Sequence, residues 1–78
     1  MYKRDEPQYW AFEIELEGND YGVWLSNPHE RRPFYAKPTW YRRTLPAAER
    51  KGNRELAKLR KRLIRDNERR AELKSKGY

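Results

Sequence analysis

The chain contains no cysteine, one histidine and two serines among its 78 residues. Without cysteine there is neither a disulfide nor a thiolate metal site, which agrees with a reducing compartment. His29 follows Asn27 and Pro28 in an expected turn, so we interpret it as a solvated loop residue. A Ser-His-acid triad with Ser26 or Ser75 is therefore disfavoured. We predict that the chain is not an enzyme and that it binds no cofactor and no metal.

Glycine and long apolar runs are also scarce. The four glycines are isolated, so no glycine-rich phosphate loop is expected. No apolar run approaches the roughly 18 residues that a membrane span requires, and residues 1–6 lack the apolar core of a signal peptide. We expect a cytoplasmic monomer with no membrane contact.

Charge is abundant and unevenly distributed. Residues 45–78 contain twelve Lys/Arg and five Asp/Glu, a net charge of +7, whereas residues 1–44 contain seven of each. Ten of the eleven aromatic residues lie at or before Tyr41. We predict one folding unit in which an aromatic, β-rich head (1–44) is joined to a basic helical tail (45–78). The distal part of the tail, from residue 66, is expected to be mobile or to lie on a partner.

The head shows the pattern of an antiparallel sheet. Large apolar side chains alternate with small and acidic ones from Tyr9 to Glu17, which predicts a half-buried strand. Residues 18–22 predict a hairpin loop, and 23–26 the returning strand. Residues 34–37 lie between two prolines and predict a short edge strand. The expected fold is α+β, with a two- or three-stranded antiparallel sheet made of a hairpin at about 9–26 and an edge strand at about 34–37.

The tail predicts a basic helix over about 45–75 that packs on this sheet. Thr44 is an N-cap candidate and Pro46 suits the first turn. Gly52 and Asn53 suggest a break or a kink in the helix. The apolar positions form one narrow stripe, which consists of Leu56, Leu59, Leu63 and Ile64.

Two segments combine many cations with few carboxylates. Residues 31–43 hold five cations, four aromatics and no acid, and aromatic rings can stack on bases while Arg neutralises phosphate. For Phe34 and Trp40 we favour a core position. The second segment is the helix face turned away from the leucine stripe. The candidate residues for a nucleic acid or another acidic partner are Arg31, Arg32, Arg42, Arg43, Arg54, Lys58, Lys61, Arg62, Arg65 and Arg69.

An acidic strand face is the other candidate surface. Glu13, Glu15 and Glu17 point to one side, as a solvated face that protects the sheet edge or as a docking surface for a basic protein patch. A metal site is disfavoured because such side chains are about 6.5–7 Å apart and diverge. Tyr35 and Tyr41 are further protein-docking candidates. If these glutamates neutralised the cations of the helix in internal ion pairs, no exposed positive surface would remain.

In its size, its lack of cysteine, its aromatic head ending near Arg43 and its basic tail from Thr44, the chain resembles small bacteriophage proteins that bind bacterial RNA polymerase and modify transcription termination. The resemblance implies a regulator in the host cytoplasm that binds polymerase near the emerging RNA, with residues 54–69 close to nucleic acid. A free-standing RNA- or DNA-binding module and a structural dimer formed through the helix are the alternatives. Asp66 and Arg70 argue against the dimer because they would fall in its seam.

Overall fold

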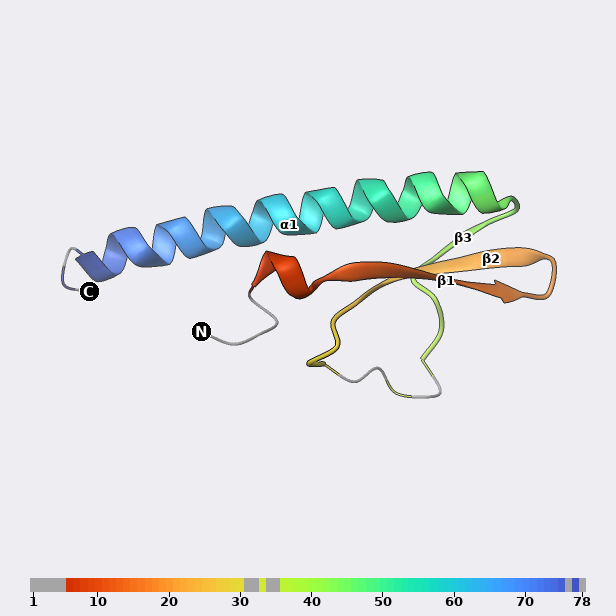
Figure 1. The fold of residues 1–78 in the computed structure, drawn as a ribbon, viewed down its shortest axis with the longest axis horizontal. Helices are drawn as coiled ribbons and strands as arrows, with labels where there is room; N and C mark the ends of the chain where they lie inside the picture. The colour runs from red at the N-terminus through yellow and green to blue at the C-terminus, as the bar shows by residue number, and fades with distance from the viewer. Residues whose placement is uncertain (1–5, 31–32, 34–35, 76, 78) are drawn as a thin grey trace.

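A long helix lies along one face of a small antiparallel sheet (Figure 1). The computed structural model describes residues 6–30, 33, 36–75 and 77. The strands pair antiparallel in the order β1-β2-β3, so the predicted α+β fold is confirmed. The elements, in chain order, are the 3-10 helix η2 (Pro7–Tyr9), β1 (Ala11–Glu17), β2 (Asp20–Ser26), β3 (Trp40–Arg42) and α1 (Leu45–Ser75).

The hairpin turn is shorter than predicted. Glu17 pairs with Asp20, which leaves a two-residue turn in place of a loop over 18–22. Gly18 has a φ of 64°, the left-handed conformation that a tight hairpin turn needs at its first central position. One such residue is sufficient to reverse the chain, so β2 begins two residues before Gly22.

The first strand also begins later than predicted. Tyr9 belongs to η2, where its N–H donates to the carbonyl of Glu6 at 3.2 Å, and the N–H of Trp10 donates to the carbonyl of Pro7 at 3.2 Å. Proline suits the start of such a turn because it has no N–H to leave unpaired. The turn therefore precedes β1, which starts at Ala11.

The third strand lies at Trp40–Arg42, so its predicted position at 34–37 is wrong. Ala36 and Lys37 lie outside any strand, and Phe34 and Tyr35 lie outside the described residues. The N–H of Ala36 donates to the carbonyl of Pro33 at 3.0 Å, which closes a turn.

Pairing begins directly after Pro38. The N–H of Thr39 donates to the carbonyl of Val23 at 3.0 Å, and Trp40 is then paired with Val23. Pro38 itself has no N–H to donate to the sheet. The two prolines therefore bracket a turn, and β3 occupies the first segment with free donors.

The core is small and lies between the sheet and the first half of α1. Its buried apolar residues are Val23, Ala48, Leu56 and Leu59. On the helix these positions, together with the buried Gly52, follow the spacing of one face of an α-helix. The small residues Ala48 and Gly52 extend the predicted leucine stripe by two turns toward the N-terminus of α1, which lets the helix approach the sheet closely.

The helix is continuous through Gly52 and Asn53, so the expected break is absent. A Cβ added at Gly52 would lie 2.2 Å from Cδ2 of Phe12. The absence of a Cβ at this glycine therefore lets the helix pack closely against the ring of Phe12 in β1. This tertiary contact overrides the low helix propensity of glycine.

The helix extends beyond the sheet. It has 31 residues, which corresponds to about 46 Å at 1.5 Å per residue, and the molecule measures 53 × 24 × 15 Å. Figure 1 shows its C-terminal turns past the end of the sheet, and residues 68–75 are all exposed. The distal part of the tail is thus helical to Ser75, and its side chains contribute little to the core.

Replacement of Thr44 with alanine is expected to destabilise the fold. Thr44 Oγ1 accepts a hydrogen bond from the N–H of Ala47 at 3.4 Å, as an N-cap does, so its loss should cost about 1 kcal/mol. The melting temperature should fall by roughly 4–8 °C in a thermal scan followed by circular dichroism. Thr44→Ser retains the acceptor and should melt close to the wild type; an equal loss in both variants would contradict the capping role.

Candidate nucleic-acid interface

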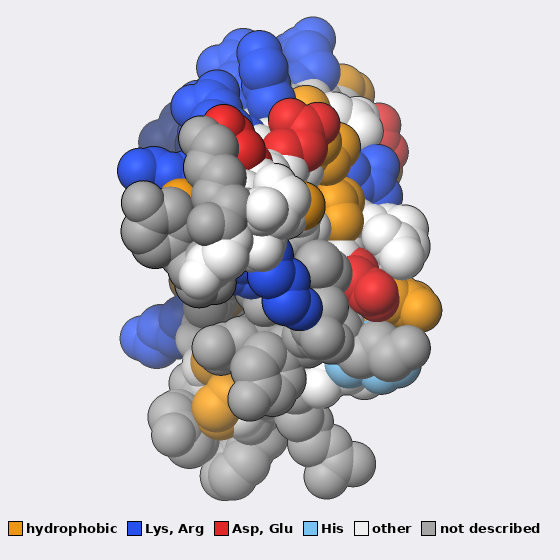
Figure 2. Space-filling model, turned by 90° about the vertical axis from the view of Figure 1, so that its left-hand side faces the viewer, with side chains coloured by type: hydrophobic (Ala, Val, Ile, Leu, Met, Phe, Trp, Pro, Cys, Tyr) orange, Lys and Arg blue, Asp and Glu red, His pale blue; other side chains and the backbone are white. Residues whose placement is uncertain are grey.

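One side of α1 carries a row of exposed cations, here called the cationic ridge. Because successive residues are rotated by about 100°, these positions gather on a side turned away from the buried stripe. From the first to the last, the ridge is about 22 Å long. Figure 2 looks from the C-terminal end of α1 and shows Lys and Arg side chains gathered over the helix. The ridge consists of Arg54, Lys58, Lys61, Arg62, Arg65 and Arg69, all exposed.

Few carboxylates neutralise the ridge. Glu55 Oε1 accepts from Lys51 Nζ at 3.0 Å and from Lys58 Nζ at 3.4 Å. The side chain of Lys58 is still 67% exposed. The side chains of the other five members of the ridge have neither an ion pair nor a hydrogen bond with any residue in the described part of the chain. An extended, largely unpaired positive surface results.

Not every cation of α1 belongs to this surface. Arg60 lies on the opposite flank of the helix, where its Nη2 donates to the carbonyl of Trp10 at 2.9 Å. This contact joins the helix to the segment that leads into β1. Arg60 therefore has a structural role, which agrees with its absence from the predicted site.

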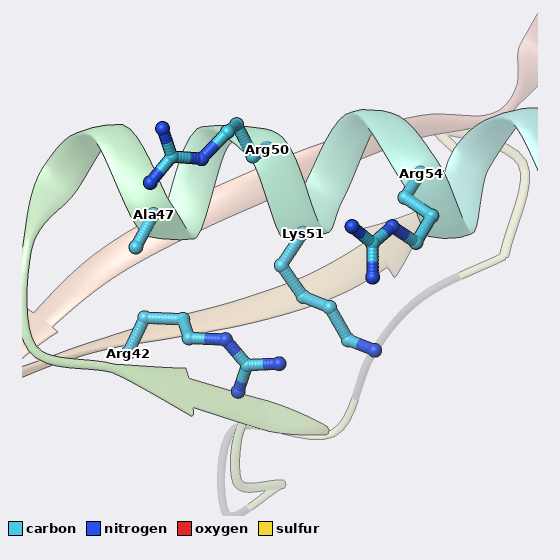
Figure 3. Close-up of a pocket in the computed structure, with 5 residues that line it drawn as sticks. All are labelled: Arg42, Ala47, Arg50, Lys51 and Arg54. Carbon is cyan, nitrogen blue, oxygen red and sulfur yellow. The ribbon is translucent and has the colours of Figure 1, made fainter.

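A small hollow lies between β3 and the N-terminal half of α1. It has a volume of about 170 Å³ and is lined by Arg42, Ala47, Arg50, Lys51 and Arg54. In Figure 3 the side chain of Arg42 extends from β3 toward that of Lys51, Arg54 turns back toward Lys51, and Arg50 extends along the helix toward Ala47. The structure thus brings the predicted Arg42 and Arg54 together at the N-terminal end of the ridge.

Arg50 and Lys51 were missed by the sequence reasoning. Because a break was expected at Gly52, the predicted basic face began at Arg54. Arg50 lies four residues before Arg54 and was left out. In a continuous helix that spacing places the two arginines on neighbouring turns of one side. The spacing was present in the sequence, but a long-range contact was needed to show that the helix runs on.

Lys51 is held in position from two sides. Its ammonium group lies 5.1 Å from the centre of the Trp40 ring and is paired with Glu55, and both charged side chains are only 16% exposed. Trp40 is paired with Val23, on the sheet face that packs on α1, and it is half-buried beneath Lys51. It is therefore not one of the fully buried core residues.

The acidic strand face lies on the other side of the sheet. Strand alternation directs Glu13, Glu15 and Glu17 away from the side of Phe12, which packs on α1. Glu13 Oε2 accepts from Trp24 Nε1 at 3.0 Å, and Glu17 Oε2 accepts from the Tyr41 hydroxyl at 3.3 Å. Glu13 and Glu17 are therefore bonded to aromatic side chains of their own face, and all three carboxylates are directed away from the ridge.

Some predicted residues lie elsewhere or outside the described structure. Arg43 is exposed between β3 and α1, and Arg31, Arg32 and Tyr35 lie outside the described residues. His29 is exposed in a turn, where its N–H donates to Asn27 Oδ1 at 2.9 Å and its ring meets that of Tyr9 edge-on at 4.7 Å.

Within residues 6–30, 33, 36–75 and 77, no three His, Cys, Asp or Glu side chains are grouped so that they could hold a metal ion. In the same residues no helix has the length and apolarity that crossing a membrane requires. Neither protein-family models, nor curated proteins, nor solved structures show a match to this chain. Function is therefore inferred from the geometry of the described surfaces.

The ion pairs of Glu55 predict a pH-dependent stability. The hydrogen bond from Lys51 lowers the pKa of Glu55 below its ordinary value, and the bond from Lys58 adds to this. A carboxyl whose pKa is lowered by folding stabilises the fold above its ordinary pKa, and this contribution is lost as the pH falls through the lowered value.

Melting curves of the wild type and Glu55→Gln should therefore differ at about pH 7, with the wild type more stable, and the difference should shrink as the pH falls through the lowered pKa of Glu55. Glu49→Gln removes an exposed carboxylate of the same helix and controls for the loss of one charge. A gap between wild type and Glu55→Gln that persists at low pH would show that the ion pairs are not its cause.

Proposed function

We propose that the chain is a small regulator that binds the phosphate backbone of RNA or DNA through the cationic ridge and docks through its acidic strand face on a protein of a nucleic-acid-processing complex. RNA polymerase is the complex that the resemblance to bacteriophage termination regulators suggests. The proposal places the chain in the cytoplasm, where it acts as a monomer, and assigns it no catalytic step.

The observation that carries the proposal is the separation of the two charged surfaces. The ridge lies on the helix, and the strand glutamates lie on the face of the sheet that is turned away from the helix. There Glu13 and Glu17 accept hydrogen bonds from Trp24 and Tyr41. A positive surface about 22 Å long is therefore left available on a rigid helix. Cations in such a row release counterions when they neutralise phosphates, which drives binding to nucleic acid without reading sequence.

The positions of the aromatic rings favour backbone contact over base stacking. Trp40 lies beneath Lys51, and Tyr41 is directed to the acidic face, where its hydroxyl donates to Glu17. Base stacking needs rings that are open to a strand and adjacent to cations. We therefore infer recognition of the phosphate backbone, with little preference for base sequence.

The acidic strand face supports the protein half of the proposal. Tyr41 is 40% exposed beside Glu17, so the face combines carboxylates with an amphipathic ring, as protein interfaces often do. It would repel a phosphate backbone and attract a basic protein patch. The helical dimer is less favoured because Leu56 and Leu59 are already buried within the chain.

The nucleic-acid half is tested by titrating the purified chain against one RNA and one DNA duplex at several salt concentrations. Binding should weaken steeply with salt, with a slope of log affinity on log salt of about −4.5 to −5.4 on duplex DNA if five or six ridge cations each contact a phosphate. A slope near zero, or no binding at low salt, would contradict it.

The protein half is tested separately with nuclease-treated bacterial RNA polymerase. Retention on the immobilised chain that is lost in Glu15→Lys/Glu17→Lys supports docking through the acidic face. Equal retention by this variant, or no retention by the wild type, would contradict that half and leave the nucleic-acid half standing.

A further inference from the structure

The hollow between β3 and α1 concentrates more positive charge than a single backbone phosphate requires. Four of its five lining residues are cations and none is a carboxylate. Glu55 is bound to Lys51 at 3.0 Å, and when it is included the local net charge is still +3. A phosphodiester carries one negative charge, whereas a terminal phosphate carries about two at neutral pH.

Two of the four cations of the hollow are also held in place. Lys51 is fixed between Trp40 and Glu55, and Arg42 Nη1 donates to the carbonyl of Tyr41 at 2.7 Å. Groups that are already ordered lose little conformational entropy when they bind an anion. The side chains of Arg50 and Arg54 are exposed and make no ion pair or hydrogen bond with any described residue, so their forked donors are available to phosphate oxygens.

The position of the hollow favours a phosphate at the end of a strand. It lies at the N-terminal end of the ridge, and the residues before Arg50 in α1, 45–49, contain no cation. A strand that follows the ridge would therefore reach the end of the helix cations here, and the exposed Arg43 just before α1 adds to the same positive end. A volume of about 170 Å³ corresponds to roughly five or six water molecules, which is room for a phosphate group and its oxygens.

We propose that this hollow binds the 5′-phosphorylated end of a nucleic acid strand whose backbone lies along the cationic ridge, and that a triphosphate is preferred to a monophosphate. The inference rests on the proposed function, since the ridge must first hold the strand. The guanidinium groups of Arg42, Arg50 and Arg54 would donate to the terminal phosphate oxygens, with Lys51 as a fixed charge behind them.

The test compares one short RNA strand with a 5′-hydroxyl, a 5′-monophosphate or a 5′-triphosphate by fluorescence anisotropy. The triphosphate should bind about tenfold more tightly than the hydroxyl form, with the monophosphate between them. Inorganic pyrophosphate should compete more strongly against the triphosphate strand than against the hydroxyl strand.

Two double variants locate the effect. Arg42→Gln/Arg50→Gln should reduce the preference to about one, while Arg62→Gln/Arg65→Gln, which removes the same charge from the ridge, should weaken all three strands in parallel and keep the preference. Circular dichroism checks that both variants are folded; the wild-type competition with pyrophosphate tests the site without any variant.

Equal binding of the three strands by the wild type would overturn this inference alone, since the hydroxyl strand would still report ridge binding. Failure of every strand to bind would overturn the proposed function first. A preference that survives in Arg42→Gln/Arg50→Gln would show that another part of the chain binds the phosphate end, and pyrophosphate that displaces both strands equally would show that the hollow takes free polyphosphate instead.

Discussion

Replacement of Arg62, Arg65 and Arg69 with glutamine is expected to lower the affinity for RNA and DNA about a hundredfold at moderate salt. These three arginines have no partner among the described residues, so each is free to neutralise one phosphate. Three lost contacts should also reduce the slope of log affinity on log salt by about 2.7 for duplex DNA. Glutamine has nearly the helix propensity of arginine, so α1 should persist.

The matched control changes charge on the opposite face. Glu13→Gln/Glu15→Gln/Glu17→Gln raises the net charge by three, yet it leaves the ridge intact. If the ridge is the binding surface, this variant should bind nucleic acid much as the wild type does, with an unchanged salt slope. A large gain in its affinity, or a small loss in the arginine variant, would indicate that total charge governs binding.

Gly52→Ala is expected to destabilise the fold by about 2 kcal/mol, although alanine is the better helix former. An alanine Cβ would lie 2.2 Å from Cδ2 and 2.5 Å from Cγ of Phe12, so the ring or the helix must shift. So close a clash places the overpacking cost at the upper end of its usual range, about 3 kcal/mol, and the gain of about 1 kcal/mol in helix propensity offsets only part of it. The melting temperature should fall by roughly 8–16 °C.

The adjacent Asn53 offers the control, because it is exposed on the same turn of α1. Asn53→Ala should raise stability by up to about 0.5 kcal/mol through helix propensity alone. Combining Gly52→Ala with Phe12→Leu should remove much of the penalty, since the two side chains are in contact. If Gly52→Ala melts above the wild type, the close approach of helix and strand is not what limits this position.

Local sequence patterns were sufficient to predict most of the helices and strands. Alternation over Phe12, Ile14 and Leu16 predicted β1, and Thr44 with Pro46 predicted the start of α1, because both signals act within a few residues of the chain. The third strand was placed too early because Pro33 and Pro38 were interpreted as strand boundaries. The pairing of β3 begins after the N–H of Thr39 donates to the carbonyl of Val23. The sequence alone does not show this contact between distant residues.

Helical and strand periodicity are enough to predict a cationic helix face and an acidic strand face. The folded molecule adds that these faces lie on opposite sides, that Gly52 packs on Phe12 without ending the helix, and that Arg42 meets Arg50, Lys51 and Arg54 at one hollow. The physical reason is that periodicity orients side chains within one element, whereas the meeting of two elements depends on contacts between residues far apart in the chain.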